Sequence, residues 1–395
     1  MKLQHGIHLG YCTNIHRGES WEETFAGLSQ HTDRVRQRVC PDDPYAIGLR
    51  LGYDAIYELN SDPARKKEFA KWLDETNSYL FTINGFPYGR FHGGRVKEQV
   101  YAPDWTTTER LDYTNALFDF VVEMAPPGDE VSVSTLPGSF KEFIKPETAE
   151  EQIDAIVKNL RACSRHIGKL RDRTGRDIHL GLEPEPLGLF ENTAESIAFF
   201  ERLVDKVPSA ERESILQNIG INYDTCHFAV EFEDAASSLP TLVSNGLRIS
   251  KIHLSSALAL PPTDENVQRL GTFDDEVYLH QTIVQSGGEV SKRFRDIPDV
   301  MEWYPNHREE AGDEWRVHFH IPLHAGPDGD FGDTTSQISG VLEEVAKDPD
   351  LCRHFEMETY TWEVMPASMQ SSDVVDQLAA EYDWCLAEFS KAGLR

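Results

Sequence analysis

The chain has 395 residues, enough to bury a large core in one big α/β barrel or in two ordinary domains. Hydrophobic residues make up 39% of it and charged residues 27%, a composition that is typical of a folded globular protein and excludes a disordered one. Because 67 acidic residues stand against 38 basic ones, the formal net charge is −29. This charge disfavours non-specific binding to nucleic acids and anionic lipids, and it favours a small-molecule ligand.

Two further features indicate a cytoplasmic protein. No apolar run approaches the roughly 20 residues that cross a bilayer, and the start, MKLQHGIHLGYC, has no apolar stretch before a small-residue cleavage site. The six cysteines are scattered along the chain, which is typical of reduced thiols and not of a disulfide framework. We therefore expect neither secretion nor membrane insertion.

Strand-like and helix-like segments alternate almost from end to end. Helix starts are marked by capping-box signatures such as Ser20 with Glu23 and Thr148 with Glu151. Alternation of this kind requires a parallel sheet, and about eight repeats predict a (β/α)8 TIM barrel, in which the last strand pairs with the first. We expect a single domain that spans residues 1–395. The predicted strands lie at residues 8–16, 46–51, 79–89, 130–136, 178–184, 219–224, 248–254 and 354–359.

One region departs from this pattern. Between about 258 and 314, Pro261-Pro262, Gly287-Gly288 and many charged residues predict an insertion between the seventh and eighth strands. The segment that follows, WRVHFHIPLH at 315–324, is predicted to be extended and is rich in histidine.

Acidic and histidine side chains close four of the predicted strands: Glu183, Asp224, His253 and Glu358. The carboxyl ends of all strands in a barrel meet on one face, and neighbouring strands lie roughly 5 Å apart, so these side chains can close around one ion. Three carboxylates and one imidazole favour Mn²⁺, Mg²⁺, Co²⁺ or Zn²⁺. The alternative is that each is an isolated polar residue that is hydrogen-bonded or solvated at a strand end.

Three more histidines could belong to the same site. His227 follows Asp224 by three residues and is interpreted as a further ligand or a substrate contact. His318 and His320 alternate with Phe319, so on a strand they face the same side and could form half of a second metal site. A polar strand face at the protein surface would explain this pair equally.

Polar loops follow the first and third predicted strands. They carry Asn14, His16, Asn84 and His92 in the stretches TNIHRGES and NGFPYGRFHGG. Loops at the rim of a barrel bear ligand-contacting residues, so these four are candidates for substrate binding. Ordinary turn chemistry accounts for the asparagines and glycines equally well.

The motifs LEPEP, DTCHF, KIHL and METYTW occur in the order found in the xylose-isomerase-like TIM-barrel superfamily, which the chain resembles. That superfamily includes ketose 3-epimerases, sugar isomerases and endonuclease IV. The resemblance implies that Glu183, Asp224, His253 and Glu358 are metal ligands and that His227 lies beside the substrate. It also implies that Glu183 and Glu358 are the acid/base pair that moves a proton.

A narrower resemblance covers nearly the whole chain. The stretches YCTNIHRGESW, GLRL, NGFPYGRFHG, STLPGSF, DTCHF, HFHIPLH and ETYTWEV are similar to the EboE "metabolite traffic" family. This resemblance implies the handling of a biosynthetic precursor that is destined for export, together with pathway-protein partners. The insertion enlarges the region beside the active face, which allows a substrate bulkier than a free sugar.

Three functions compete on this evidence. The first is metal-assisted isomerisation or epimerisation of a small polyhydroxylated or carbonyl-bearing metabolite. The second is a divalent-metal-dependent hydrolase or phosphodiesterase of the endonuclease IV type acting on a small substrate, which is favoured if His318 and His320 help to hold a second ion. The third is a non-catalytic metabolite-binding protein of the same pathway. The number of bound metals separates the first two.

Overall fold

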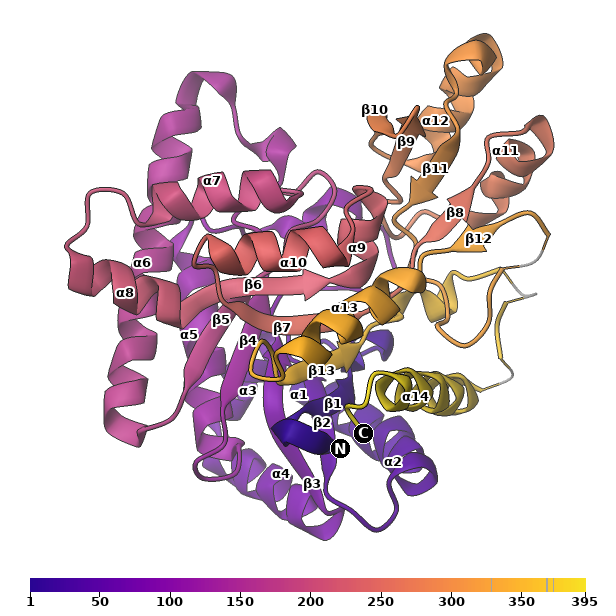
Figure 1. Ribbon diagram of the computed structural model, residues 1–395. Coiled ribbons are helices and arrows are strands. Elements are labelled where there is room, and N and C mark those ends of the chain that lie inside the picture. Colours follow the sequence, from indigo (N-terminus) through magenta and orange to yellow (C-terminus); the bar gives the residue numbers. More distant parts are fainter. Residues whose placement is uncertain (328, 367–368, 372) are drawn as a thin grey trace.

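A ring of eight parallel strands forms the centre of the molecule (Figure 1). The computed structural model describes residues 1–395 except 328, 367–368 and 372. The strand order is β1-β13-β7-β6-β5-β4-β3-β2, and a parallel bridge between Cys12 and Gly48 brings the β1 and β2 edges together. The predicted TIM barrel is therefore confirmed. Its strands are β1 (His8–Tyr11), β2 (Tyr45–Arg50), β3 (Ser78–Asn84), β4 (Val131–Thr135), β5 (Ile178–Leu182), β6 (Ile219–Asp224), β7 (Ile249–Leu254) and β13 (His354–Met357).

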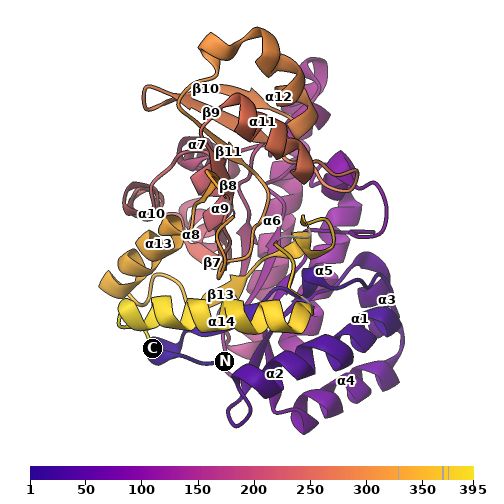
Figure 2. The same cartoon turned by 90° about the vertical axis from the view of Figure 1, so that its right-hand side faces the viewer.

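Helices cover the outside of this ring (Figures 1 and 2). Local sequence signals set several of their ends: Ser20 and Glu23 form the predicted capping box, Asp62 caps a helix that begins with Pro63, and Gly175 ends the longest helix in a left-handed conformation. These helices are α1 (Trp21–Gly27), α2 (Asp33–Val39), α3 (Tyr53–Ser61), α4 (Pro63–Glu75), α5 (Thr108–Met124), α6 (Ala149–Thr174), α7 (Thr193–Leu203), α8 (Ser209–Asn218), α9 (Thr225–Val230), α10 (Ala235–Ser244), α13 (Ser336–Lys347) and α14 (Val374–Lys391).

The segment between β7 and β13 builds a second, antiparallel sheet beside the barrel (Figure 2). Its strand order is β10-β9-β11-β8-β12, and it has an apolar core of its own around Trp315 and Phe319. The inserted sheet ends at Asp333, beyond the expected limit near 314, because β11 and β12 both pair with β8. The sequence does not show that these two strands belong to the insertion. Its elements are β8 (Leu258–Leu260), α11 (Asp264–Leu270), β9 (Thr282–Ser286), β10 (Glu289–Phe294), α12 (Ile297–Trp303), β11 (Glu314–Val317) and β12 (Gly332–Asp333).

Two expectations about the environment of the chain can be compared with the structure. Among the described residues, no helix combines the length and the apolarity that crossing a membrane requires. All six cysteines are buried and free, as scattered thiols predict.

Candidate metal centre

The four side chains chosen from the strand ends meet at one point. Glu183 directly follows β5, Asp224 ends β6, His253 precedes the last residue of β7, and Glu358 follows β13. Strand register pairs Asp224 with His253. All four are buried, and one ligand atom from each lies within 4.8 Å of the others. The structure thus brings together the set that the sequence predicts as metal ligands.

The imidazole of His253 lies among the three carboxylates. Its Nδ1 is 2.9 Å from Glu183 Oε1, 3.0 Å from Glu358 Oε2 and 3.7 Å from Asp224 Oδ2. Glu183 Oε2 and Asp224 Oδ2 are buried without a hydrogen-bond partner among the described residues. Buried carboxylate oxygens require a positive partner, and oxygen and imidazole donors suit a divalent cation. The residues therefore fit such an ion.

The pKa values of these groups show how strongly the site attracts positive charge. Burial raises the pKa of Glu183 to about 7, against the opposing charge of His253. Burial disfavours the charged form of His253, but the Glu358 and Glu183 carboxylates outweigh it and raise the pKa well above its usual value. Burial would likewise raise the pKa of Glu358, yet the His253 charge holds it below its usual range. A cation bound here would replace the proton on His253.

The Asp-x-x-His motif has a simple local geometry. Asp224 is the N-cap of α9, and its Oδ1 accepts a hydrogen bond of 2.9 Å from the backbone amide of His227. The same oxygen accepts a bond of 2.6 Å from Ser255 Oγ. These bonds hold one oxygen of Asp224 and leave Oδ2 facing the centre, so the cap orients the carboxylate.

Glu358 is held by two of the candidate substrate-binding residues. Asn14 Nδ2 and Asn84 Nδ2 donate to Glu358 Oε1 at 2.8 and 3.2 Å. Both asparagines line the cavity above the centre. By contrast, His16 and His92 line a separate hollow of the surface. The His92 ring instead braces the site, because its two nitrogens contact the Asn14 carbonyl and the Tyr278 hydroxyl.

A buried ion pair lies directly beneath the centre. Lys251 of β7 and Glu356 of β13 are fully buried and bonded to each other, and Glu356 Oε2 is also 3.3 Å from His253 Nε2. Glu356 thereby fixes the far side of the His253 ring. Lys251 was not predicted from the sequence, and Glu356 was considered there only as a possible replacement for Glu358 as a ligand. The available signal was spacing, because each lies two residues from a candidate ligand and so shares its strand face.

His227, His318 and His320 form a second group next to the first. Each donates a hydrogen bond from Nδ1 to a carbonyl oxygen. His227 donates to Pro184 O at 3.1 Å, His318 to Gln281 Oε1 at 2.8 Å and His320 to Glu358 O at 2.9 Å. The Gln281 amide is oriented by its own bond to Pro186 O. Burial lowers the pKa of His227 and of His318, so the Nε2 atoms of these two rings are acceptors.

The Nε2 atoms of this group face inward. Those of His227 and His318 are 3.0 Å apart, and His320 Nε2 has no partner within the described part of the chain. Ligand atoms of His227, His320 and Asp224 lie within 4.8 Å of one another. The alternation argument for His318 and His320 needs correction, since β11 ends at Val317 and both histidines follow the strand. Their carbonyl partners, and not a strand pleat, aim them inward.

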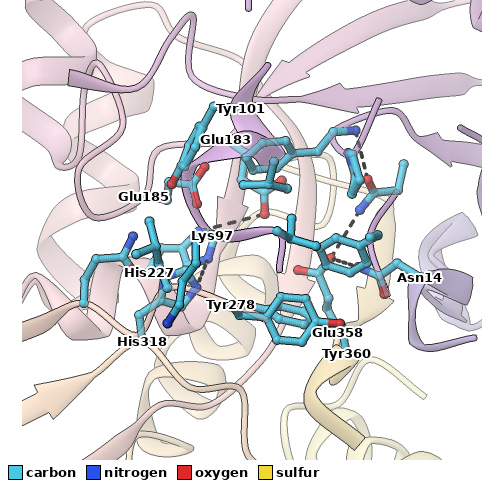
Figure 3. Close-up of a pocket in the computed structure, with 18 residues that line it drawn as sticks. Asn14, Lys97, Tyr101, Glu183, Glu185, His227, Tyr278, His318, Glu358 and Tyr360 are labelled. Atoms are coloured by element: carbon cyan, nitrogen blue, oxygen red, sulfur yellow. Dashed lines mark hydrogen bonds and ion pairs between the residues drawn. The ribbon is translucent and has the colours of Figure 1, made fainter. Parts of the chain in front are cut away.

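A cavity opens above the candidate metal centre (Figure 3). Its floor includes Glu183, Glu358 and His227. Glu185 is also buried there, and its Oε1 has no partner among the described residues. Burial together with the neighbouring Glu183 charge raises its pKa well above the usual value. The inserted segment supplies Tyr278, Leu279, Gln281 and His318 to the lining, so the barrel alone does not complete this cavity.

No family model matches the chain, and no curated protein matches it significantly. Two solved structures share its fold over almost its full length. D-psicose 3-epimerase with D-tagatose from Clostridium cellulolyticum H10 is 10% identical, with 98% of this chain and 100% of that chain covered and a TM-score of 0.52. The IolI protein with a bound zinc atom is 10% identical, with 98% and 99% covered and a TM-score of 0.51. The chain therefore has the same TIM-barrel fold as these two proteins.

Proposed function

We propose that the protein is a divalent-metal-dependent isomerase or epimerase acting on a small polyhydroxylated or carbonyl-bearing metabolite. The observation that carries this proposal is the buried group of Glu183, Asp224, His253 and Glu358. Two of its carboxylate oxygens lack a partner among the described residues, and one of the two belongs to Glu183, which lines the cavity. The two structural neighbours, one an epimerase with its sugar and the other a zinc-bound protein, support the same chemistry on the same fold.

The residues of the site have the following roles in this proposal. All four residues serve as ligands, and a bound divalent cation would polarise adjacent oxygens of the substrate. Glu183 and Glu358 act as the acid/base pair: one accepts a proton from the carbon next to the substrate carbonyl, and a proton is returned from a carboxyl group. Asn14 and Asn84 keep Glu358 in place through their bonds to Oε1.

A place in the traffic of a biosynthetic precursor, in the cytoplasm and with pathway-protein partners, belongs to the same proposal. It rests on the sequence motifs shared with the EboE family. A polyol or keto compound that is made in one enzymatic step and consumed in another is a suitable substrate for this chemistry.

The proposal is tested by isotope exchange. Protein loaded with Mn²⁺ is incubated in D₂O with a panel of ketoses and keto-cyclitols, and NMR follows deuterium uptake next to the carbonyl. We expect metal-dependent exchange that falls at least 100-fold in Glu358→Gln, a loss typical of a missing general acid or base, and is unchanged in Glu109→Gln, which lies exposed on α5. Full exchange in Glu358→Gln would contradict the assigned role.

A second candidate function is metal-dependent hydrolysis of a small phosphoester or related compound. It is favoured by the 3.0 Å separation of the His227 and His318 Nε2 atoms, which would suit a second cation. Two-metal hydrolases hold their ions about 3.5–4 Å apart and bind the attacking and leaving oxygens between them. Release of phosphate from a phosphomonoester panel by protein containing two metals, without deuterium exchange, would favour this alternative over the isomerase.

A further inference from the structure

We propose that the substrate of this cavity is amphiphilic, with a polar head that carries adjacent oxygens on the metal floor and an apolar ring or chain against the upper wall. This inference rests on the proposed function, because the metal centre positions the head. It adds a substrate class that neither the fold nor the metal ligands define.

The floor and the wall of the cavity differ in chemistry (Figure 3). Polar atoms that lack partners lie on the floor: Asn14 Oδ1, Glu183 Oε2 and Glu185 Oε1 are all buried and unbonded among the described residues. Half of the eighteen lining residues are apolar or aromatic. These include Phe86, Val96, Val100, Leu279 and Tyr360.

Aromatic rings form a continuous part of this wall. The ring centroids of Phe91, Tyr278 and Tyr360 lie 5.1 to 5.3 Å apart in each pairing. Val100 packs against the same group. Such a surface can hold an aromatic or aliphatic group by burial of apolar area.

Three polar groups of the wall, those of Tyr278, Lys97 and Tyr101, are already engaged with protein atoms. The Tyr278 hydroxyl is bonded to His92 Nδ1 at 2.7 Å, and Lys97 Nζ donates to Asp296 Oδ2 at 2.6 Å and to Asp275 O at 2.8 Å. The Tyr101 hydroxyl is bonded to Glu185. Beside these three groups the outer hydroxyl groups of a free sugar would lose water without gaining equivalent partners, whereas an apolar group has no hydrogen bonds to lose.

The wall is built by two distant segments that hold each other. The loop after β3 contributes Phe91, Val96 and Val100, while the inserted segment contributes Tyr278 and Leu279. Backbone amides of Val96 and Lys97 both donate to Val277 O, at 2.9 and 2.7 Å. The Lys97–Asp296 ion pair is buried beside them. The inserted segment thus completes the apolar wall and is bonded to the loop that forms the rest of it.

Hydroxamates test this inference, since their two adjacent oxygens chelate divalent metals while the attached group can be varied. Calorimetry on Mn²⁺-loaded protein compares acetohydroxamate, hexanohydroxamate and benzohydroxamate. One buried methylene strengthens binding about fourfold. We therefore expect the two larger compounds to bind at least tenfold more tightly than acetohydroxamate.

Matched variants test whether the apolar wall causes the tighter binding of the larger hydroxamates. Val100→Asn introduces a polar group into the wall, and Val243→Asn makes the same change at a valine that is 42% exposed on α10. Val100→Asn should reduce the advantage of the larger hydroxamates at least threefold and leave acetohydroxamate unchanged, while Val243→Asn behaves as wild type. If Val100→Asn has a lowered thermal midpoint, Leu279→Asn is measured in its place.

The outcomes separate the inference from the function on which it rests. Equal affinities for all three hydroxamates in wild type would overturn the amphiphilic substrate and leave the metal centre intact. The amphiphilic substrate would also be overturned if the larger hydroxamates kept their full affinity advantage over acetohydroxamate in Val100→Asn and in Leu279→Asn. Failure of the protein to bind Mn²⁺ and every hydroxamate would overturn the proposed function and this inference together.

Discussion

The Nε2 atoms of His227 and His318 lie 3.0 Å apart in a buried position, and each ring has already donated its Nδ1 hydrogen to a carbonyl oxygen. Burial lowers the pKa of His227 to about 4 and that of His318 well below its usual value, so both rings are neutral near pH 7. Two nitrogen lone pairs at this distance repel each other unless a cation lies near both. The pair therefore predicts a second, weaker metal site.

His318→Ala should lower the bound metal by one equivalent and leave the ion at Glu183 and Asp224 in place, because His318 is not among those ligands. Elemental analysis after dialysis against Zn²⁺ measures the count. His324→Ala is the matched control, since His324 is half-buried and belongs to none of the groups of possible metal ligands. An unchanged count in His318→Ala would show that the pair binds no metal.

The buried pair under the centre makes a stability prediction. Lys251→Met removes the lysine partner of Glu356 in the barrel interior, and loss of one partner of a buried ion pair costs about 3–5 kcal/mol. The double variant Lys251→Met/Glu356→Gln removes both charges and should recover much of that loss. Urea unfolding of the three proteins measures the free energies. A double variant as unstable as the single one would contradict the ion-pair explanation.

Gly48 provides the space that Glu356 occupies. A Cβ at this position would lie 1.8 Å from Glu356 Oε1 and 2.6 Å from the Tyr11 carbonyl oxygen, which is backbone and cannot move aside. Gly48→Ala should therefore destabilise the barrel by about 1–3 kcal/mol, as overpacked cores do. At Gly89 a Cβ meets nothing within 4 Å, so Gly89→Ala is the control. Equal thermal midpoints for both variants would refute the packing argument.

Glu381 on α14 predicts a pH dependence of stability. Complete burial raises its pKa from 4.5 to about 8. The unfolded chain releases this proton near pH 4.5 and the folded chain only near pH 8, so the contribution of Glu381 to stability is greatest below pH 4.5 and is lost as pH rises to 8. Glu381→Gln should flatten this slope and raise stability at pH 8.5 by a few kcal/mol. Asp383→Asn, exposed on the same helix, should keep the wild-type slope in urea titrations. If Glu381→Gln kept the wild-type slope of stability against pH, another group would be responsible for the pH dependence.

The barrel and the metal centre could be predicted from the sequence because both depend on local patterns. Strand segments separated by helices determine a parallel ring, and a strand's last residue lies at its carboxyl end whatever its neighbours do. Asp224 could be placed because it also caps the helix that follows. The same reasoning could have placed Lys251 and Glu356 near the site, because each lies two residues from His253 or Glu358 and so shares its strand face.

The cavity wall could not be predicted, because it depends on pairing between distant segments. Tyr278 and Leu279 reach the cavity from a stretch without regular periodicity, which is positioned when β9 pairs with β11. His318 and His320 were expected on a strand, yet side-chain bonds to carbonyls determine their direction. Such contacts are set by the assembled fold and leave no signature in a local pattern.

The central claim is that Glu183, Asp224, His253 and Glu358 hold a divalent cation, and anomalous X-ray diffraction from crystals grown with Mn²⁺ or Zn²⁺ tests it most directly. We predict an anomalous peak about 2.0–2.3 Å from an atom of each ligand. In Asp224→Ala the peak should disappear while the barrel persists, since this strand-end residue contributes one helix cap worth about 1 kcal/mol. An empty centre in wild type at saturating metal, or a fully occupied one in Asp224→Ala, would contradict the account.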